Sequence, residues 1–216
     1  MPRDASETRR KLLDAAALAF AEHGARNASL VEITRRAGQR NSGALHYHFG
    51  SREGVLCAVL DEHVDFLADR EGELLAVARG RPADDVASVV EAVVRPAAEL
   101  AERDWRGRCF LLILADLVEE DPATLGPELN AVLARTGGQA VDALLTARLP
   151  TLSPEVVLER LSLMTMFILR AVADRARAGG AATRTTGRPQ LDYEAFVRNL
   201  VAMAAAAVAA PRPRRR

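Results

Sequence analysis

The sequence has little cysteine, few aromatic residues and a single lysine, Lys11, against 28 arginines. The two cysteines, Cys57 and Cys109, are too few for a disulfide framework and fit a reducing compartment, so we expect a cytoplasmic protein. The longest apolar run, residues 200–211, is rich in alanine and too short to span a bilayer. The first fourteen residues carry charges of both signs and lack the apolar core of a signal peptide. We therefore expect no membrane partner.

Basic and acidic side chains balance at 29 each, yet they are unevenly distributed. Residues 1–55 contain nine basic and six acidic residues, whereas residues 56–211 contain sixteen basic and twenty-three acidic ones. The last five residues add four arginines. A net charge of zero argues against nucleic acid as a partner, but a basic N-terminal segment on an acidic body leaves that partner open.

The residue pattern predicts an all-α protein of about nine helices, because Ala, Leu, Arg and Glu dominate and alternating apolar and polar positions are absent. Residues 179–191 are rich in Gly, Thr and Pro and predict a loop, and residues 211–216 predict a disordered basic tail. Capping residues and glycines place the predicted helices at about 5–23, 29–37, 42–48, 51–78, 81–102, 104–120, 127–149 with a break at 137–138, 153–178 and 192–209.

The three short helices at the N-terminal end indicate a helix-turn-helix. Ser29 and Glu32 form a capping box for the second helix, which ends at Ala37–Gly38 before a short third helix. Leu45 and Phe49 lie four residues apart in that third helix and can pack inward. Polar side chains are then left on its outer face, where they can reach base edges in a DNA groove.

Residues 29–56, SLVEITRRAGQRNSGALHYHFGSREGVL, resemble the DNA-binding signature of TetR/AcrR-type transcriptional regulators. The resemblance implies a helix-turn-helix domain over residues 1–50 and a helical ligand-binding and dimerisation domain over residues 51–210. It also implies a repressor that binds a near-palindromic operator as a homodimer and is released by a small-molecule effector. The matching positions follow in order over about fifty residues: Ala15, Phe20, Gly24, Ile33, Ala37, Gly38, Gly43, Leu45, His48, Phe49, Ser51 and Glu53.

The sequence departs from the family pattern between the second and third helices. One extra residue separates Ala37–Gly38 from Leu45, within residues 39–41, so either the turn is longer or the recognition helix begins with an added residue. His46 stands where the family usually has Tyr, and Arg52 stands where it usually has Lys. These two replacements keep hydrogen-bonding capacity and positive charge, so contacts to phosphates remain expected.

The residue chemistry assigns roles in DNA binding. Arg40 is the candidate for bidentate readout of guanine, and Asn41 either caps the helix or reads adenine. Tyr47 either donates a hydrogen bond to a phosphate or packs within the head. The predicted DNA contacts are Ser29, Thr34, Arg40, Asn41, Ser42, Gly43, His46, Tyr47, His48 and Arg52.

In the family that the chain resembles, the body holds an effector pocket, and the last two long helices form the dimer interface. The helix expected over residues 153–178 is apolar on more than one stripe, which favours burial against both a core and a partner, with burial inside one monomer as the alternative. The pocket candidates, each with a core position as the alternative, are Phe66, Trp105, Cys109, Phe110, Ile113, Met164 and Phe167. The interface candidates are Leu158, Leu161, Thr165, Leu169, Phe196, Leu200 and Met203.

Three other functions stay open. An enzyme would need a nucleophile elbow, a phosphate loop or a set of metal ligands, and none stands out. His46 and His48 lie two apart and would point in different directions on a helix, so we expect no metal and no cofactor. The remaining alternatives are a sequence-tolerant DNA binder and a ligand-binding dimer that has lost DNA recognition through its altered turn.

Overall fold

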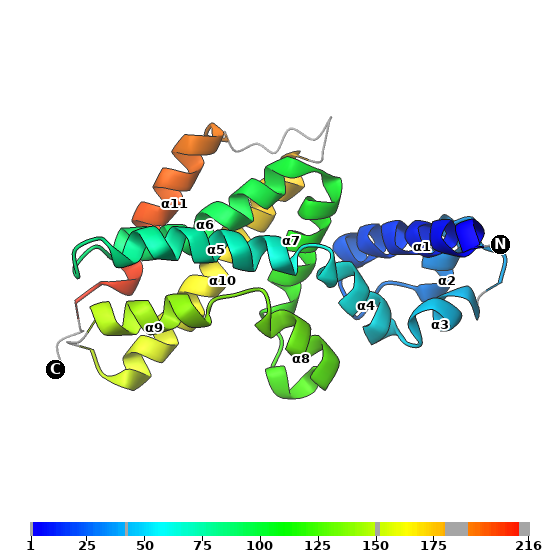
Figure 1. The fold of residues 1–216 in the computed structure, drawn as a ribbon, viewed down its shortest axis with the longest axis horizontal. Coiled ribbons are helices and arrows are strands. Elements are labelled where there is room, and N and C mark those ends of the chain that lie inside the picture. The colour runs from blue at the N-terminus through cyan, green and yellow to red at the C-terminus, as the bar shows by residue number, and fades with distance from the viewer. Residues whose placement is uncertain (1, 42, 150–151, 180–189, 212–216) are drawn as a thin grey trace.

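The computed structural model describes residues 2–41, 43–149, 152–179 and 190–211, with side chains from residue 5 onward. Within these ranges it contains eleven α-helices and one short 3₁₀-helix, so the prediction of an all-α fold is confirmed and the count of about nine helices was too low. Figure 1 shows an elongated molecule, with α1 to α4 at one end and the longer helices of the body at the other. Most of the loop predicted over residues 179–191 and of the tail predicted over residues 211–216 lies outside the described residues.

The N-terminal head consists of α1 (Pro2–His23), α2 (Leu30–Arg36) and α3 (Gly43–Phe49). The helix α1 starts earlier than predicted and ends at His23, and the next residue, Gly24, has a φ of 83° that is readily adopted only by a residue without a Cβ. Ser29 caps α2 by accepting a hydrogen bond from the backbone N–H of Glu32, as its sequence context predicts. The three helices share a core that includes the buried side chains Leu12, Phe20, Ile33 and Leu45.

The single helix predicted after Ser51 is in fact two helices, α4 (Arg52–Asp61) and α5 (Val64–Arg79), separated at Glu62–His63. The break follows from tertiary packing, because α4 packs against α1, α3 and α8, whereas α5 packs along α6. At the break His63 has a φ of −132°, and its ring meets the buried ring of Phe110 edge-on.

The body continues with α6 (Val86–Arg103), α7 (Trp105–Leu117), a 3₁₀-helix (Pro122–Thr124), α8 (Pro127–Ala134), α9 (Gln139–Arg148), α10 (Pro154–Gly179) and α11 (Tyr193–Val208). The side chain of Asp85 caps α6 by accepting from Ser88 N, so this helix starts later than predicted. The predicted caps Asp104 and Asp192 are observed at α7 and α11. The helix α10 packs against α6, α7 and α11. Among the described residues, no helix is both long and apolar enough to cross a membrane.

Candidate nucleic-acid interface and body cavity

The short helix α3 presents an unusually exposed aromatic side chain at the end of the molecule. Leu45 is buried against the head, whereas Tyr47 on the opposite side of α3 is 82% exposed. The ring of Tyr47 meets the half-buried ring of His48 edge-on, with 5.0 Å between centroids, and His46 is also exposed. The outer face of α3 therefore offers hydroxyl and imidazole groups that can donate hydrogen bonds to a phosphate or a base edge.

The extra residue of the sequence lies in the turn and not in the recognition helix. The α2 helix ends at Arg36 with Ala37 as its C-cap, Gly38 has a φ of 72°, and α3 begins only at Gly43. The side chain of Asn41 accepts a hydrogen bond of 2.8 Å from Gly43 N, which is the capping role considered for it. Arg40 precedes this cap and is exposed. Ser42, a further predicted contact, lies outside the described residues.

Two of the predicted DNA contacts, Thr34 and Arg52, donate hydrogen bonds to backbone carbonyls of the protein itself. Thr34 is buried and its hydroxyl donates to Leu30 O at 2.8 Å, so its assignment as a DNA contact is corrected. Arg52 is half-buried, and its guanidinium donates to two carbonyl oxygens of the α1–α2 loop, Ala25 O at 3.2 Å and Ala28 O at 2.7 Å. Ser29 is exposed at the start of α2. The hydrogen bonds of Arg52 thus connect α4 to the loop that precedes α2.

We expect Arg52→Ala to lower the free energy of unfolding by about 1–3 kcal/mol, because two carbonyls lose a charged donor. For a chain of this size that is a decrease in Tm of roughly 3–10 °C. Differential scanning calorimetry measures the change, with Arg35→Ala, an exposed arginine of α2, as the control. An unchanged Tm together with weaker DNA binding would instead identify Arg52 as a phosphate contact.

The head is fastened to the body by several polar contacts. The guanidinium of Arg106 in α7 makes a two-point ion pair with Asp14 of α1, at 2.8 and 2.9 Å. Asp116, also in α7, accepts a hydrogen bond of 3.2 Å from Ala25 N. A third contact joins the body to α4, which packs against α1 and α3 of the head: Glu53 of α4 accepts from Leu129 N of α8 at 3.3 Å. Movements of α7 and α8 would therefore be transmitted to the head.

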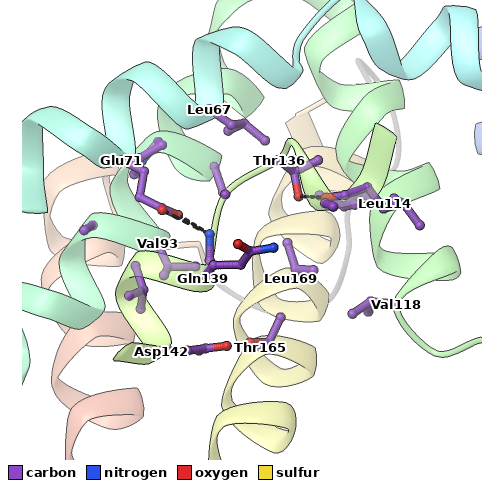
Figure 2. A pocket seen from close by; sticks show the side chains of 18 of the residues that line it. Leu67, Glu71, Val93, Leu114, Val118, Thr136, Gln139, Asp142, Thr165 and Leu169 are labelled. Carbon is purple, nitrogen blue, oxygen red and sulfur yellow. Dashed lines mark hydrogen bonds between the residues drawn. The ribbon is translucent and has the colours of Figure 1, made fainter. Parts of the chain in front are cut away.

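A cavity of about 310 Å³ lies in the body between α5, α6, α7, α9, α10 and the turn after α8 (Figure 2). This volume falls at the lower end of the range for small-molecule sites. Of the predicted pocket residues only Met164 lines it, and the predicted interface residues Thr165 and Leu169 line it as well. The apolar part of the lining includes Leu67, Val93, Pro96, Leu114, Val118, Leu133 and Val141.

The other predicted pocket residues lie elsewhere. Cys109, Phe110 and Ile113 are buried on α7 but do not line the cavity, to which this part of the chain contributes Leu114 and, directly after the helix, Val118. Phe66 lies under the guanidinium of Arg103, and Trp105 lies under that of Arg106. Phe167 does not line the cavity and is 39% exposed. The pocket candidates were chosen as large or polarizable side chains, and these properties did not locate the cavity.

The cavity contains a buried carboxylate that the sequence analysis missed. Glu71 of α5 is only 8% exposed, and its two oxygens lie 2.8 and 3.0 Å from the donating N–H of Gly138 (Figure 2). Burial raises the pKa of Glu71 above its usual value, while the hydrogen bond from Gly138 lowers it in part. A Cβ at Gly137 would lie 2.5 Å from this carboxylate, so the Gly137–Gly138 turn makes room for it.

The predicted interface residues divide into exposed and buried side chains. Leu158 and Met203 are exposed on α10 and α11. Leu161, Leu169 and Leu200 are buried within the protomer, so their assignment to a contact with a second chain is corrected. Phe196 is half-buried under the guanidinium of Arg175. Two further apolar side chains are exposed on α10, Leu163 at 54% and Phe167 at 39%, and neither was among the predicted interface residues.

Comparison with known proteins identifies the family. Residues 12–59 match the bacterial regulatory proteins of the tetR family, and residues 91–207 match the tetracyclin repressor-like C-terminal domain. The second match alone spans more than half of the chain, so this protein belongs to the TetR family of transcriptional regulators. It is a DNA-binding regulator with a ligand-binding C-terminal domain, and the enzyme alternative is set aside.

Individual relatives agree with this assignment. The A-factor receptor protein of Streptomyces griseus is 39% identical over 72 residues, a match that spans 33% of this chain and 26% of the relative. FadR from Bacillus subtilis in complex with stearoyl-CoA superposes with a TM-score of 0.58 at 16% identity, over 92% of this chain and 98% of that one. AibR in complex with isovaleryl coenzyme A and operator DNA gives a TM-score of 0.56 at 17% identity, over 91% and 97%. At these identities the two structures support the fold.

Proposed function

We propose that this regulator is a cytoplasmic repressor that binds a near-palindromic operator as a homodimer and releases it when a small molecule occupies the body cavity. Residues 1–50 would form the DNA-binding domain and residues 51–210 the effector-binding and dimerisation domain. The observation that carries the proposal is the outer face of α3, where Tyr47 is 82% exposed at the end of the molecule. The hydroxyl of this exposed tyrosine and the imidazole of the exposed His46 are free of the protein core and can donate hydrogen bonds to phosphates, which favours a DNA-contacting surface.

A homodimer is supported by the apolar side chains that remain exposed on the two terminal helices. Leu163 and Phe167 lie one turn apart on α10, and Met203 lies on α11, which packs beside α10. Ala202 and Ala206 are exposed on α11 and allow close approach of a second helix. A two-fold axis through this face would pair two heads with two half-sites, which increases affinity and specifies a palindrome.

Coupling between cavity and head is supported by α7 and α8. Leu114 of α7 and Val118, the residue that follows α7, line the cavity, while Asp116 between them accepts a hydrogen bond from Ala25 N in the head. In α8, Leu133 lines the cavity and Leu129 N donates to Glu53 of α4. A ligand that favours one position of these helices would change the separation of the two heads and with it the affinity for the operator.

A mobility-shift assay on the DNA upstream of the chain's own gene tests the proposal. We expect nanomolar binding of a fragment with two half-sites, much weaker binding of a random duplex, and a complex of one dimer per site. Equal affinity for both duplexes would favour the sequence-tolerant binder. A stable dimer that binds neither duplex would favour a ligand-binding protein without DNA recognition.

We expect Tyr47→Phe to weaken binding to operator and random DNA alike, by about 2- to 10-fold, because the hydroxyl donates to a phosphate that every sequence shares. Fluorescence anisotropy with both duplexes at a fixed salt concentration measures the change. Tyr193→Phe, which removes a hydroxyl from α11 in the body, is the matched control. Unaltered affinity for both duplexes would remove Tyr47 from the interface.

A further inference from the structure

The wall of the body cavity carries negative charge and, among the described lining residues, no positive charge. Glu71 from α5 and Asp142 from α9 are its two ionisable groups, and α6, α7 and α10 contribute apolar side chains and Thr165. In the view of Figure 2, Asp142 and Thr165 lie at the lower part of the cavity and Glu71 lies higher. Asp142 and Gln139 are exposed although they line the cavity, which places them at its opening. A ligand would therefore enter past one carboxylate and reach another at the inner wall.

The arginines next to the cavity in sequence are already engaged by acidic partners. Arg135, next to the lining residue Ala134, donates to Asp61 and Asp65 at 2.7 and 2.8 Å. Arg170, next to Leu169, pairs with Glu119, and Arg70, next to Glu71, pairs with Glu99 and Glu73. An anionic ligand would have to displace one of these acidic partners to find a countercharge. The multiple phosphates of a coenzyme A ester would instead meet Asp142 at the opening.

Within the part of the chain that the structure describes, the carboxylate of Glu71 does not use all of its hydrogen-bonding capacity. A carboxylate offers about four lone-pair positions, and Gly138 N supplies a single N–H donor to Glu71. Burial is the largest cause of its raised pKa, and the charge of Asp142 adds to the increase. Asp142 is accessible to solvent at the opening, and partial desolvation by the protein around it still raises the pKa of its carboxyl group. A cation placed between the two groups would stabilise the ionised form of each, whereas an anion would repel both.

We infer that the effector is a small apolar molecule with a protonated amine, which lies between Glu71 and Asp142, and that acyl-CoA thioesters are excluded. The inference rests on the proposed function, because it takes the body cavity as the effector site. Apolar side chains bind the hydrophobic part of such a ligand, and the two carboxylates accept hydrogen bonds from its ammonium group. The contrast is with the acyl-CoA molecules bound in the FadR and AibR structures.

Three probes with one apolar body and different charges test the inference: 4-phenylbutylamine, 4-phenylbutanol and 4-phenylbutyrate. Isothermal titration calorimetry on the full chain at pH 7.5 should give the affinity order amine, alcohol, carboxylate, with at least a tenfold difference between the first and last. Octanoyl-CoA should bind no better than the carboxylate. Equal or tighter binding of the carboxylate or of octanoyl-CoA would overturn the inference, as would failure of the amine to bind.

Substitution of the buried carboxylate locates the effect. Glu71→Gln keeps an oxygen that accepts from Gly138 N. It should lower the ratio of the affinity for the amine to the affinity for the carboxylate at least tenfold. Asp142→Asn at the opening should lower the same affinity ratio by a smaller factor. Asp69→Asn is the matched control, because Asp69 is exposed on the same helix outside the cavity. If Glu71→Gln retains its fold by circular dichroism and also the full preference, the ammonium group does not lie at Glu71.

The operator assay separates this inference from the proposed function. If 4-phenylbutyrate binds and releases the operator while the amine does not, the regulator is ligand-responsive and the inferred ligand class is wrong. If the amine binds with the expected preference but the operator complex persists at saturation, the ligand class stands and the cavity is not an effector site. Release of the operator by the amine, lost in Glu71→Gln, supports both.

Discussion

Phe167→Asp is expected to convert the dimer into monomers and to lower operator affinity by about 100-fold or more, because each head then binds its half-site independently. The exposed ring of Phe167 lies on α10 beside Leu163, on the face that we assign to the two-fold contact. The symmetry of that contact introduces the new carboxylate twice, so two charges are desolvated close to one another. Tertiary structure within the protomer should be preserved, since this side chain is largely outside the core.

Sedimentation velocity at micromolar concentration and a mobility-shift assay on the operator together measure this effect. Val77→Asp is the control, because Val77 is an exposed apolar residue on α5, a helix that is not part of the proposed two-fold contact. The control should sediment as a dimer and bind the operator normally. A Phe167→Asp protein that remains dimeric would place the contact between protomers on another surface.

Arg40→Ala is expected to weaken operator binding by about 5- to 150-fold, the range for loss of one bidentate contact to guanine. Binding to random DNA should fall much less. Arg40 lies in the lengthened turn directly before the cap that Asn41 forms for α3, and within the described residues it forms no ion pair or hydrogen bond. Its guanidinium is therefore available to the groove that α3 would enter.

Anisotropy titrations of operator and random duplexes at two salt concentrations measure the Arg40 effect. Arg79→Ala removes the same charge from an exposed position at the end of α5 and should change neither affinity. Equal losses on both duplexes would identify Arg40 as a phosphate contact, with a shallower salt dependence as the accompanying sign.

The parts of the fold that depend on residues close together in the sequence were predictable from the sequence. Ser29, Asp104 and Asp192 each cap a helix with their own side chains, and Gly24 ends α1 through its own backbone conformation. The break at Glu62–His63 was not predictable in this way, since it arises where α4 and α5 pack against different partners. No local signal marks it.

The candidate sites show the same division. The inward position of Leu45 follows from helical spacing within one short helix, whereas the sequence left Tyr47 open between exposure and packing within the head, and the structure exposes it. The cavity depends on which face of each of several helices turns inward, so large side chains such as Phe110 were placed in it incorrectly. Glu71 carried no signal at all, because a glutamate in an amphipathic helix ordinarily faces water, and only the contact with Gly138 reveals its burial.

The two sides of α10 have different neighbours. Met164 and Thr165 line the cavity, while Leu163 and Phe167, within a turn of them, face outward toward the proposed second protomer. A ligand that shifts this helix in one subunit would alter the packing at the axis and hence the shape of the other subunit's site. Release of the operator should then be cooperative in effector concentration, with a Hill coefficient different from one.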